Sequence, residues 1–273
     1  MDVGEVRVAD DGDFERLRNL ADQHEGWKVE YEKRDTRVWT KCTDQTQFKM
    51  IKLHTVYNDV SPSLLFDVLM DPLYRKKWDV HMLDSYDIGC LNPNNDVGYY
   101  AVRSPPPLRN RDFVLQRSWL ETGKEILIIN HSVFHQASRL GLSVPPKKGF
   151  IRATSYLTGI VVRPSGRSGC SLSYVTQCDP KGALPAWFVN KLTKIFAPKM
   201  VKKLHKACLG YVAWKSCHQP SLKPWLYPDQ VILPKLDVSS CVGAGQQDAA
   251  DENLDESLLQ EQEGSDFCEL DNA

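Results

Sequence analysis

The stretch RDFVLQRSWLETGKEILIINHSVF, residues 111–134, gives the clearest indication of the fold. It contains two runs rich in aliphatic, β-branched and aromatic side chains, 111–121 and 125–134, joined by a short turn at 121–124. Two such runs separated by so few residues pair as an antiparallel hairpin, because a parallel pairing needs a crossover of about a dozen residues or more. We therefore expect an antiparallel meander in the middle of the chain.

Neighbouring segments extend this meander in both directions. Short turns at 92–95 and 164–166 again separate apolar runs by few residues. Near the start, Trp27, Val29 and Tyr31 alternate with charged residues, as in a half-buried strand. The pattern predicts about nine strands, at 27–32, 37–43, 47–57, 82–91, 96–104, 111–121, 125–134, 150–162 and 169–178.

Helices are predicted on both sides of the meander. Asp11 is a candidate N-cap for a short helix, and Ser61 with Pro62 provides the start of a second one. A short helical piece at 74–78 follows, and a long helix at about 185–212 closes the folded part. Helices that precede and follow a sheet, rather than alternate with its strands, indicate an α+β fold.

The long closing helix carries an apolar stripe, with lysines at the other positions. Such a helix usually packs on a core, but its apolar face could also cover a cavity, and Pro198 is expected to kink it. Polar residues interrupt several apolar strands, which is either ordinary variation or a sign that one sheet face lines a partly polar cavity. These residues are Asn130, Ser132, Thr154, Ser155, Thr158 and Gln177.

The formal net charge of −1 conceals an uneven distribution. Residues 229–273 contain 12 acidic residues and one basic residue, whereas residues 1–228 contain 33 basic and 23 acidic residues. Few apolar side chains and many acids are typical of disorder. We therefore expect a folded domain over 1–228 and an acidic, disordered C-terminal tail over 229–273.

The basic excess is concentrated at 180–228, where nine lysines occur without any acidic residue. Such a segment favours anionic partners, but it has no arginine and no zinc-finger or RNP-type motif, so nucleic acid is disfavoured. Aromatic residues among the lysines favour the headgroups of an anionic membrane instead. The candidate membrane-contact residues are Lys199, Lys202, Lys203, Trp187 and Phe196.

Several classes of protein are disfavoured by what the sequence lacks. No signal peptide, transit peptide or long apolar span is visible, so we expect a cytoplasmic monomer that associates peripherally with membranes. The eight cysteines are scattered without a C-x-x-C pair, which favours free thiols over a zinc site. Without G-x-S-x-G, H-E-x-x-H, P-loop or dinucleotide motifs, we expect no cofactor, no metal and no catalytic residue.

Five segments of the sequence together resemble START (StAR-related lipid transfer) domains, and within that family the subgroup of phosphatidylcholine transfer protein. The segments are DPLYRKKWD (71–79), DVGYY (96–100), NRD (110–112), CDPKGALP (178–185) and W-x-x-N (187–190). The resemblance covers roughly residues 10–228. It implies the helix-grip fold, in which a curved antiparallel sheet wraps a long C-terminal helix around a lipid-sized tunnel. It further implies binding of one phospholipid, phosphatidylcholine and/or phosphatidylethanolamine, and its transfer between membranes.

Arg75 and Asp79 are the central pair of the binding site that this resemblance implies. Taken alone, they form an i,i+4 pair that at an exposed position contributes only about 0.3–0.5 kcal/mol. The resemblance instead places them inside the tunnel, with the arginine against the lipid phosphate. Arginine suits that role because its planar fork binds phosphate and carboxylate and stays charged when desolvated. The NRD segment at 110–112 is expected to order a turn.

The resemblance also implies aromatic residues around the lipid headgroup. Tyr100 and Tyr156 align with positions that face the headgroup, and Phe113 takes the place of a tyrosine. Leu69 and Thr158 replace a tyrosine and a glutamine of the choline-binding relative, which weakens strict choline selectivity and admits ethanolamine lipids. The full set of candidate lipid-binding residues is Arg75, Asp79, Tyr100, Phe113, Tyr156 and Thr158.

Other functions remain open at this point. A lipid sensor or adaptor without net transfer needs the same pocket, and a sterol ligand or a helix-grip enzyme are further alternatives. Arg75 with Asp79 is a poor acid–base pair, because an aspartate held by an arginine stays ionised near neutral pH. In the tail, Ser257 and Ser265 are candidate phosphorylation sites, where added phosphate would strengthen competition with anionic membrane for the lysine-rich helix.

Overall fold

The computed structural model describes residues 1–104, 108–133, 144, 147–182 and 186–237, and between 186 and 198 it describes the main chain alone. The helices are α1 (Asp11–Asp22), α2 (Pro62–Met70), α3 (Pro72–Trp78) and α4 (Ala186–Ser216), followed by a 3-10 turn at Pro228–Gln230. The strands are β1 (Lys28–Lys33), β2 (Thr36–Thr43), β3 (Thr46–Tyr57), β4 (Met82–Asn92), β5 (Asn95–Val102), β6 (Asn110–Glu121), β7 (Ile126–Ser132), β8 (Phe150–Arg152), β9 (Thr154–Ser165) and β10 (Gly169–Asp179).

All of these strands belong to one sheet. Its order is β1-β2-β3-β10-β9-β7-β6-β5-β4, with antiparallel pairing along this path, and β8 pairs in parallel with β6. In the chain α1 precedes the sheet, α2 and α3 lie between β3 and β4, and α4 follows the sheet, so the predicted α+β helix-grip arrangement with a C-terminal helix is confirmed. The predicted hairpin over residues 111–134 is the β6–β7 pair.

One predicted strand is two strands in the structure. The run at 150–162 breaks at Ala153, whose N–H donates a hydrogen bond of 3.0 Å to the carbonyl oxygen of Asp112 on β6. Residues before this point pair with β6, whereas those after it pair with β7 and β10. The chain therefore changes its neighbours at Ala153, which the run of apolar residues alone did not reveal.

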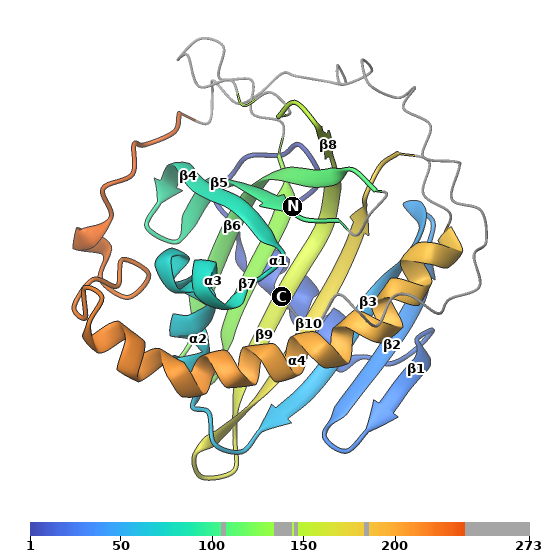
Figure 1. The fold of residues 1–273 in the computed structure, drawn as a ribbon, viewed down its shortest axis with the longest axis horizontal. Coiled ribbons are helices and arrows are strands. Elements are labelled where there is room, and N and C mark those ends of the chain that lie inside the picture. The colour runs from blue at the N-terminus through green and yellow to red at the C-terminus, as the bar shows by residue number, and fades with distance from the viewer. Residues whose placement is uncertain (105–107, 134–143, 145–146, 183–185, 238–273) are drawn as a thin grey trace.

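The two faces of the sheet carry different helices. Figure 1 shows α4 crossing in front of the sheet, with α2 and α3 on the same side, while α1 lies behind it. We call the face toward α4 the inner face and the face toward α1 the outer face. The inner face packs residues such as Leu53, Val162 and Leu172 against α2 and α4. The outer face buries Leu127 and Val161 against α1.

Close packing of α1 requires a glycine in β9. A Cβ atom on Gly159 would lie 2.2 Å from Cδ1 of Leu17, a residue of α1 that is 1% exposed. Any larger residue at this position would push the helix away from the sheet. This contact fixes the distance between α1 and the outer face.

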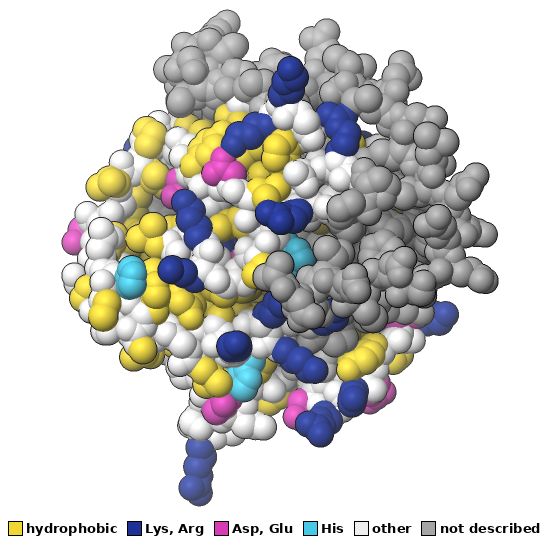
Figure 2. Space-filling model, in the orientation of Figure 1, with side chains coloured by type: hydrophobic (Ala, Val, Ile, Leu, Met, Phe, Trp, Pro, Cys, Tyr) yellow, Lys and Arg dark blue, Asp and Glu magenta, His cyan; other side chains and the backbone are white. Residues whose placement is uncertain are grey.

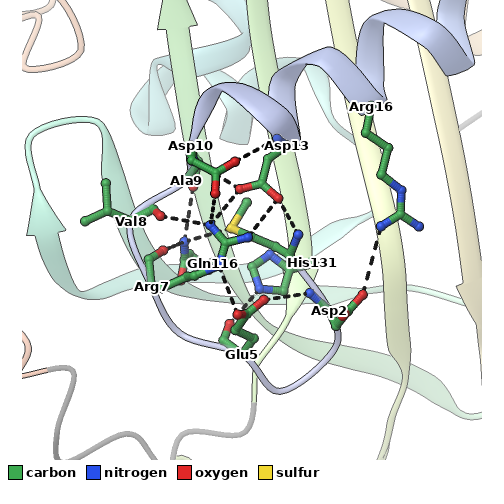
Figure 3. A network of polar contacts seen from close by, with 12 residues as sticks. Asp2, Glu5, Arg7, Val8, Ala9, Asp10, Asp13, Arg16, Gln116 and His131 are labelled. Atoms are coloured by element: carbon green, nitrogen blue, oxygen red, sulfur yellow. Dashed lines mark hydrogen bonds and ion pairs between the residues drawn. The ribbon is translucent and has the colours of Figure 1, made fainter.

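The segment before α1 is attached to the outer face by a polar network (Figure 3). Asp13 on α1 accepts hydrogen bonds from Arg7 at 2.8 and 3.0 Å and forms an ion pair with the amino group of Met1. Gln116 on β6 donates to the carbonyl oxygen of Arg7 at 2.7 Å. Burial alone would raise the pKa of Asp13, but Arg7 and the amino group outweigh it and hold that pKa well below the ordinary value of 3.8.

The segment after α4 is attached to β4, the strand at the edge of the sheet. The N–H of Cys90 on β4 donates to the carbonyl oxygen of Pro234 at 2.9 Å, and the N–H of Leu236 donates to Cys90 at 2.8 Å. Leu236 is 8% exposed and joins a hydrophobic cluster with Ile88. Residues 229–237 were assigned by the sequence to the disordered tail; within them Pro234 and Leu236 contact the domain, whereas Ile232 is 93% exposed. The remainder of that tail lies outside the described residues.

The Asp13 network predicts a pH-dependent contribution to stability. Because the pKa of Asp13 is lowered in the folded protein, its contribution is complete above about pH 5 and is lost as the pH falls below the ordinary carboxyl range. We expect Asp13→Asn to lower the free energy of unfolding by about 1–3 kcal/mol at pH 7 and by less at pH 3. Urea unfolding at both pH values measures this. Asp11→Asn, at an exposed position of α1, is the control, and an equal effect of both variants would contradict the prediction.

Candidate functional site

Helix α3 is a short helix that carries an aspartate at each end. Asp71 is its N-cap and accepts hydrogen bonds of 3.0 Å from the N–H groups of Leu73 and Tyr74. Asp79 is its C-cap, and the Asp79 N–H donates to the carbonyl oxygen of Arg75 at 2.9 Å. Residues four apart on a helix lie on one face, so this geometry brings the Arg75 and Asp79 side chains together.

Arg75, Asp79 and Tyr100 form one connected group. Nε of Arg75 donates to Oδ2 of Asp79 at 3.2 Å, and the hydroxyl of Tyr100 donates to the same oxygen at 2.8 Å. The guanidinium carbon lies 5.1 Å from the ring centre of Tyr100 and 5.8 Å from that of Trp78. Tyr100 also lies within hydrogen-bonding reach of the guanidinium, and no other partner of Nη1 or Nη2 is seen among the described residues. The planar fork therefore keeps donors available to an anion.

This group is only partly covered by protein atoms. Arg75 is surrounded by protein, yet its side chain keeps 36% of its accessible surface, and that of Asp79 keeps 12%. The guanidinium therefore lies among protein atoms without being fully packed by them. Burial disfavours the charged guanidinium, but Tyr100 and Asp79 outweigh it and keep the pKa of Arg75 above its ordinary value. Arg75 therefore keeps a fixed positive charge at this partly covered position.

A second ion pair lines the inner face of the sheet. Asp96 on β5 and Arg117 on β6 are cross-strand partners, and Arg117 donates to Asp96 through Nε at 3.1 Å and Nη2 at 2.5 Å. The Arg117 side chain is 26% exposed although it too lies deep in the protein. Burial and the nearby Arg75 oppose its charge, and Asp96 outweighs both, which raises the pKa of Arg117. Unlike that of Arg75, this guanidinium fork is already occupied by a carboxylate.

Polar residues continue from this ion pair across the inner face. Arg117 pairs with Asn130 on β7, Asn130 with Thr158 on β9, and Thr158 with Thr176 on β10. The hydroxyls of Thr158 and Thr176 lie 2.8 Å apart, and the thiol of Cys178 lies 3.4 Å from Thr176. We call Asp96, Arg117, Asn130, Thr158 and Thr176 the polar row. These side chains would give hydrogen bonds to the polar part of an enclosed ligand.

The structure brings together some of the six candidate lipid-binding residues. Arg75, Asp79 and Tyr100 form the group described above, and Phe113 is the half-buried cross-strand partner of Tyr100. Thr158 lies in the polar row. Tyr156 is half-buried on β9, and no contact between it and Arg75 is seen among the described residues.

Other predicted polar residues have different environments. Asn130 and Ser132 lie on the inner-face side of β7, and Ser132 accepts a hydrogen bond of 2.8 Å from the N–H of Ser155. Gln177 is on the outer face, where its amide donates to the carbonyl oxygen of Phe48 at 3.1 Å. Of the interrupting polar residues, Asn130 thus lies on the inner face and Gln177 on the outer face, so the pattern of interruption alone did not distinguish the two faces.

The NRD segment has a larger structural role than ordering a turn. Arg111 donates to the carbonyl oxygens of Pro180 and Lys181 at 3.0 and 2.9 Å. Asp112 is fully buried and accepts from Arg152 at 2.8 Å. These bonds attach β8 and the chain just before α4 to the sheet.

The candidate membrane residues are only partly described. Lys202 and Lys203 are exposed on α4, and Lys199 is half-buried. The side chains of Trp187 and Phe196, and the candidate phosphorylation sites Ser257 and Ser265, lie outside the described residues. No helix in the described part of the chain is long and apolar enough to span a membrane.

The cysteines and metal-ligating residues give no second site. The six cysteines in the described part of the chain are free thiols. Within these same residues, no group of three or more His, Cys, Asp and Glu side chains is placed to hold a metal ion.

Asp96 and Arg117 are the functional candidates that the sequence analysis missed. The available signal was an arginine at a position that alternates with Leu115 and Trp119 on an otherwise apolar strand face. Its partner could not be recognised, because the pairing depends on the register between β5 and β6.

Comparison with known proteins decides the family. The START domain family matches residues 7–215, which include α3, the polar row and α4. The chain belongs to the START domain family. The resemblance carried by the five sequence segments is thus confirmed.

Relatives and solved structures agree with this assignment. START domain-containing protein 10 of Mus musculus is 43% identical over 258 residues, covering 94% of this chain and 86% of the relative. Phosphatidylcholine transfer protein of Bos taurus is 30% identical over 185 residues, covering 68% and 85% respectively. The crystal structure of human STARD10 superposes with a TM-score of 0.81 at 42% identity and covers 86% of this chain and 94% of that one. Human StAR-related lipid transfer protein 5 shares the fold, with a TM-score of 0.65 at 19% identity, covering 72% of this chain and 93% of that one.

The Asp96–Arg117 pair predicts a non-additive pair of mutations. Arg117→Met leaves a carboxylate enclosed without its partner, so we expect it to lower the free energy of unfolding by about 3–5 kcal/mol. Combining it with Asp96→Asn removes both charges and should cost clearly less than the single change. Urea unfolding of the single and double variants measures the difference. Equal or larger destabilisation in the double variant would show that the pair is not coupled.

Proposed function

We propose that this protein binds one phospholipid molecule in the space between the inner face of the sheet and α4, and transfers it between membranes. The observation that carries the proposal is the partly accessible guanidinium of Arg75, for which only Asp79 and Tyr100 are seen as partners among the described residues. The relatives support it, because one of them is named phosphatidylcholine transfer protein. In this proposal the protein acts as a carrier and catalyses no reaction.

The phosphate of the lipid is expected to bind at Arg75. Its Nε is held by Asp79, which leaves the terminal nitrogens for a bidentate contact with phosphate oxygens. An enclosed ion pair is costly without further hydrogen bonds, and a bound phosphate would supply them. Arg117 suits this role less well, since Asp96 already occupies its fork. The polar row would instead contact the ester and glycerol oxygens.

The aromatic residues bear on the choice of headgroup. The rings of Tyr100 and Trp78 both lie within 6 Å of the Arg75 guanidinium, so a protein cation already occupies their faces. Choline would have to share this environment, and Leu69 and Thr158 offer no aromatic ring in its place. We therefore propose that both phosphatidylcholine and phosphatidylethanolamine are accepted.

Membrane contact is proposed for the face that carries α4. The helix has no acidic residue, and next to the exposed Lys202 and Lys203 it presents Leu209 and Val212, which are 57% and 66% exposed. Figure 2 shows basic side chains among hydrophobic ones on this face, with fewer acidic ones. This combination suits an anionic membrane surface. In this proposal the protein is a cytoplasmic monomer that touches membranes from their surface.

Arg75→Leu tests the phosphate site. The variant should fold but bind phosphatidylcholine at least about tenfold more weakly, because it lacks the charge-assisted hydrogen bonds to phosphate. Transfer of fluorescent phosphatidylcholine between donor and acceptor vesicles, and native mass spectrometry of the loaded protein, measure the loss. Lys76→Leu, at an exposed position of the same helix, is the matched control and should behave as the wild type. Undiminished lipid binding by Arg75→Leu would refute the site.

Replacing Lys199, Lys202 and Lys203 by Gln tests the membrane face. Each lysine near an anionic surface contributes about 1 kcal/mol, so we expect binding to phosphatidylserine-containing vesicles to fall at least about tenfold. Vesicle co-sedimentation and transfer rates measure this. The same change at Lys28, Lys33 and Lys41 on the β1–β2 hairpin is the control. If both triple variants bind anionic vesicles equally well, α4 is not the contact.

A further inference from the structure

The N-terminal end of α3 is joined to α4 by a buried carboxylate. Oδ2 of Asp71 accepts hydrogen bonds from Nζ of Lys215 at 2.8 Å and from the hydroxyl of Tyr211 at 3.0 Å. Its other oxygen, Oδ1, caps α3 through the N–H groups of Leu73 and Tyr74. One side chain thus binds both helices, and we call this arrangement the Asp71 joint.

Tyr74 adds a second connection between the same two helices. Its hydroxyl donates to the carbonyl oxygen of Ala207 at 2.8 Å, and its ring packs 5.0 Å from that of Tyr211 and 4.8 Å from that of Trp214. The backbone N–H of Arg75, the next residue, donates to the carbonyl oxygen of Asp71 at 2.9 Å. A displacement of α4 at these contacts must therefore move the turn that carries Arg75.

The Asp71 joint is not explained by stability alone. Asp71 is 1% exposed and Lys215 is 6% exposed, so both charges are removed from water. Such a pair often stabilises a protein no more than apolar residues of the same volume would, whereas its hydrogen bonds impose a defined geometry. Here the imposed geometry is the orientation of α3 relative to α4.

We propose that Asp71 is a positioning residue that couples α4 to the phosphate-binding arginine. It touches no ligand; it holds α3 so that Arg75 presents its terminal nitrogens to the lipid phosphate. Because α4 also carries the proposed membrane face, a displacement of α4 on contact with a membrane would be transmitted to Arg75 through the Asp71 joint. The inference rests on the proposed binding of lipid phosphate at Arg75.

The chain offers a matched comparison on the neighbouring helix. Asp67 of α2 is 7% exposed and accepts hydrogen bonds from Nζ of Lys223 at 2.5 Å and from Nε1 of Trp225 at 2.8 Å. This carboxylate also joins a helix to a later segment of the chain, but it has no part in α3. Removing its ion pair should affect stability without moving Arg75.

The test compares two double variants of the full chain, Asp71→Asn with Lys215→Met and Asp67→Asn with Lys223→Met. Each removes both charges of a buried pair, and Asn at position 71 can still cap α3. The proteins are incubated with vesicles that contain phosphatidylcholine and diacylglycerol with the same acyl chains, and the ratio of the two bound lipids is measured by mass spectrometry. We expect the ratio to fall about fivefold or more in the Asp71 variant and to stay unchanged in the Asp67 variant.

The ratio separates positioning from general damage, because a merely structural loss lowers the binding of both lipids alike. An unchanged ratio in a folded Asp71 variant, or an equal fall in both variants, overturns the inference. Should the Asp71 variant not fold, Tyr211→Phe, which removes one hydrogen bond to the same oxygen, decides in its place by the same criterion. Arg75→Leu distinguishes failure of the phosphate site from failure of the coupling. If Arg75→Leu leaves the ratio of the two lipids unchanged, the proposed phosphate site is wrong. If Arg75→Leu lowers the ratio but the Asp71 variant does not, only the coupling is wrong.

Discussion

A permanently charged guanidinium enclosed by protein is the constraint on which the rest of this structure depends. Arginine cannot become neutral by losing a proton in a protein, so its surroundings have to compensate the charge. Asp79 and Tyr100 do so for Arg75, and Asp96 does so for Arg117. With two such pairs, part of the inner face stays polar beside the apolar core that Leu53, Val162 and Leu172 form on it. The polar row follows from this requirement.

The outer face of the same strands is packed with apolar side chains instead of charged ones. There, Leu17 of α1 packs directly on Gly159, and Leu127 and Val161 are buried with it. Alternate residues of β7 and β9 thus point into a close-packed core on one side, whereas on the other side buried Ile128 and Val162 are followed by polar Asn130 and Thr158. The packed side keeps the sheet in shape, which allows the other side to remain open to a guest molecule.

The sequence predicted the elements well and the site only in part. Alternation and short turns identified the β6–β7 hairpin, since both are local signals, whereas the break at Ala153 depends on a hydrogen bond to a distant strand. Arg75 and Asp79 resemble an exposed helical pair, and only the family resemblance predicted their burial. Arg117 remained unrecognised because strand register, rather than its neighbours in sequence, brings it to Asp96. Local sequence patterns were enough to predict the order of the elements, but not which polar groups meet in the interior.

The attachment of the C-terminal segment to Cys90 affects whether two copies of this protein can pair through their sheet edges. An unclosed sheet has two terminal strands whose free amide and carbonyl groups could recruit a neighbouring chain. On β4 the N–H and carbonyl groups of Cys90 are instead hydrogen-bonded to Pro234 and Leu236 of the same chain. On β1, the other terminal strand, Lys28 and Lys33 are exposed and repel an identical strand. Both edge strands of the sheet are thereby protected against pairing with the edge of another copy.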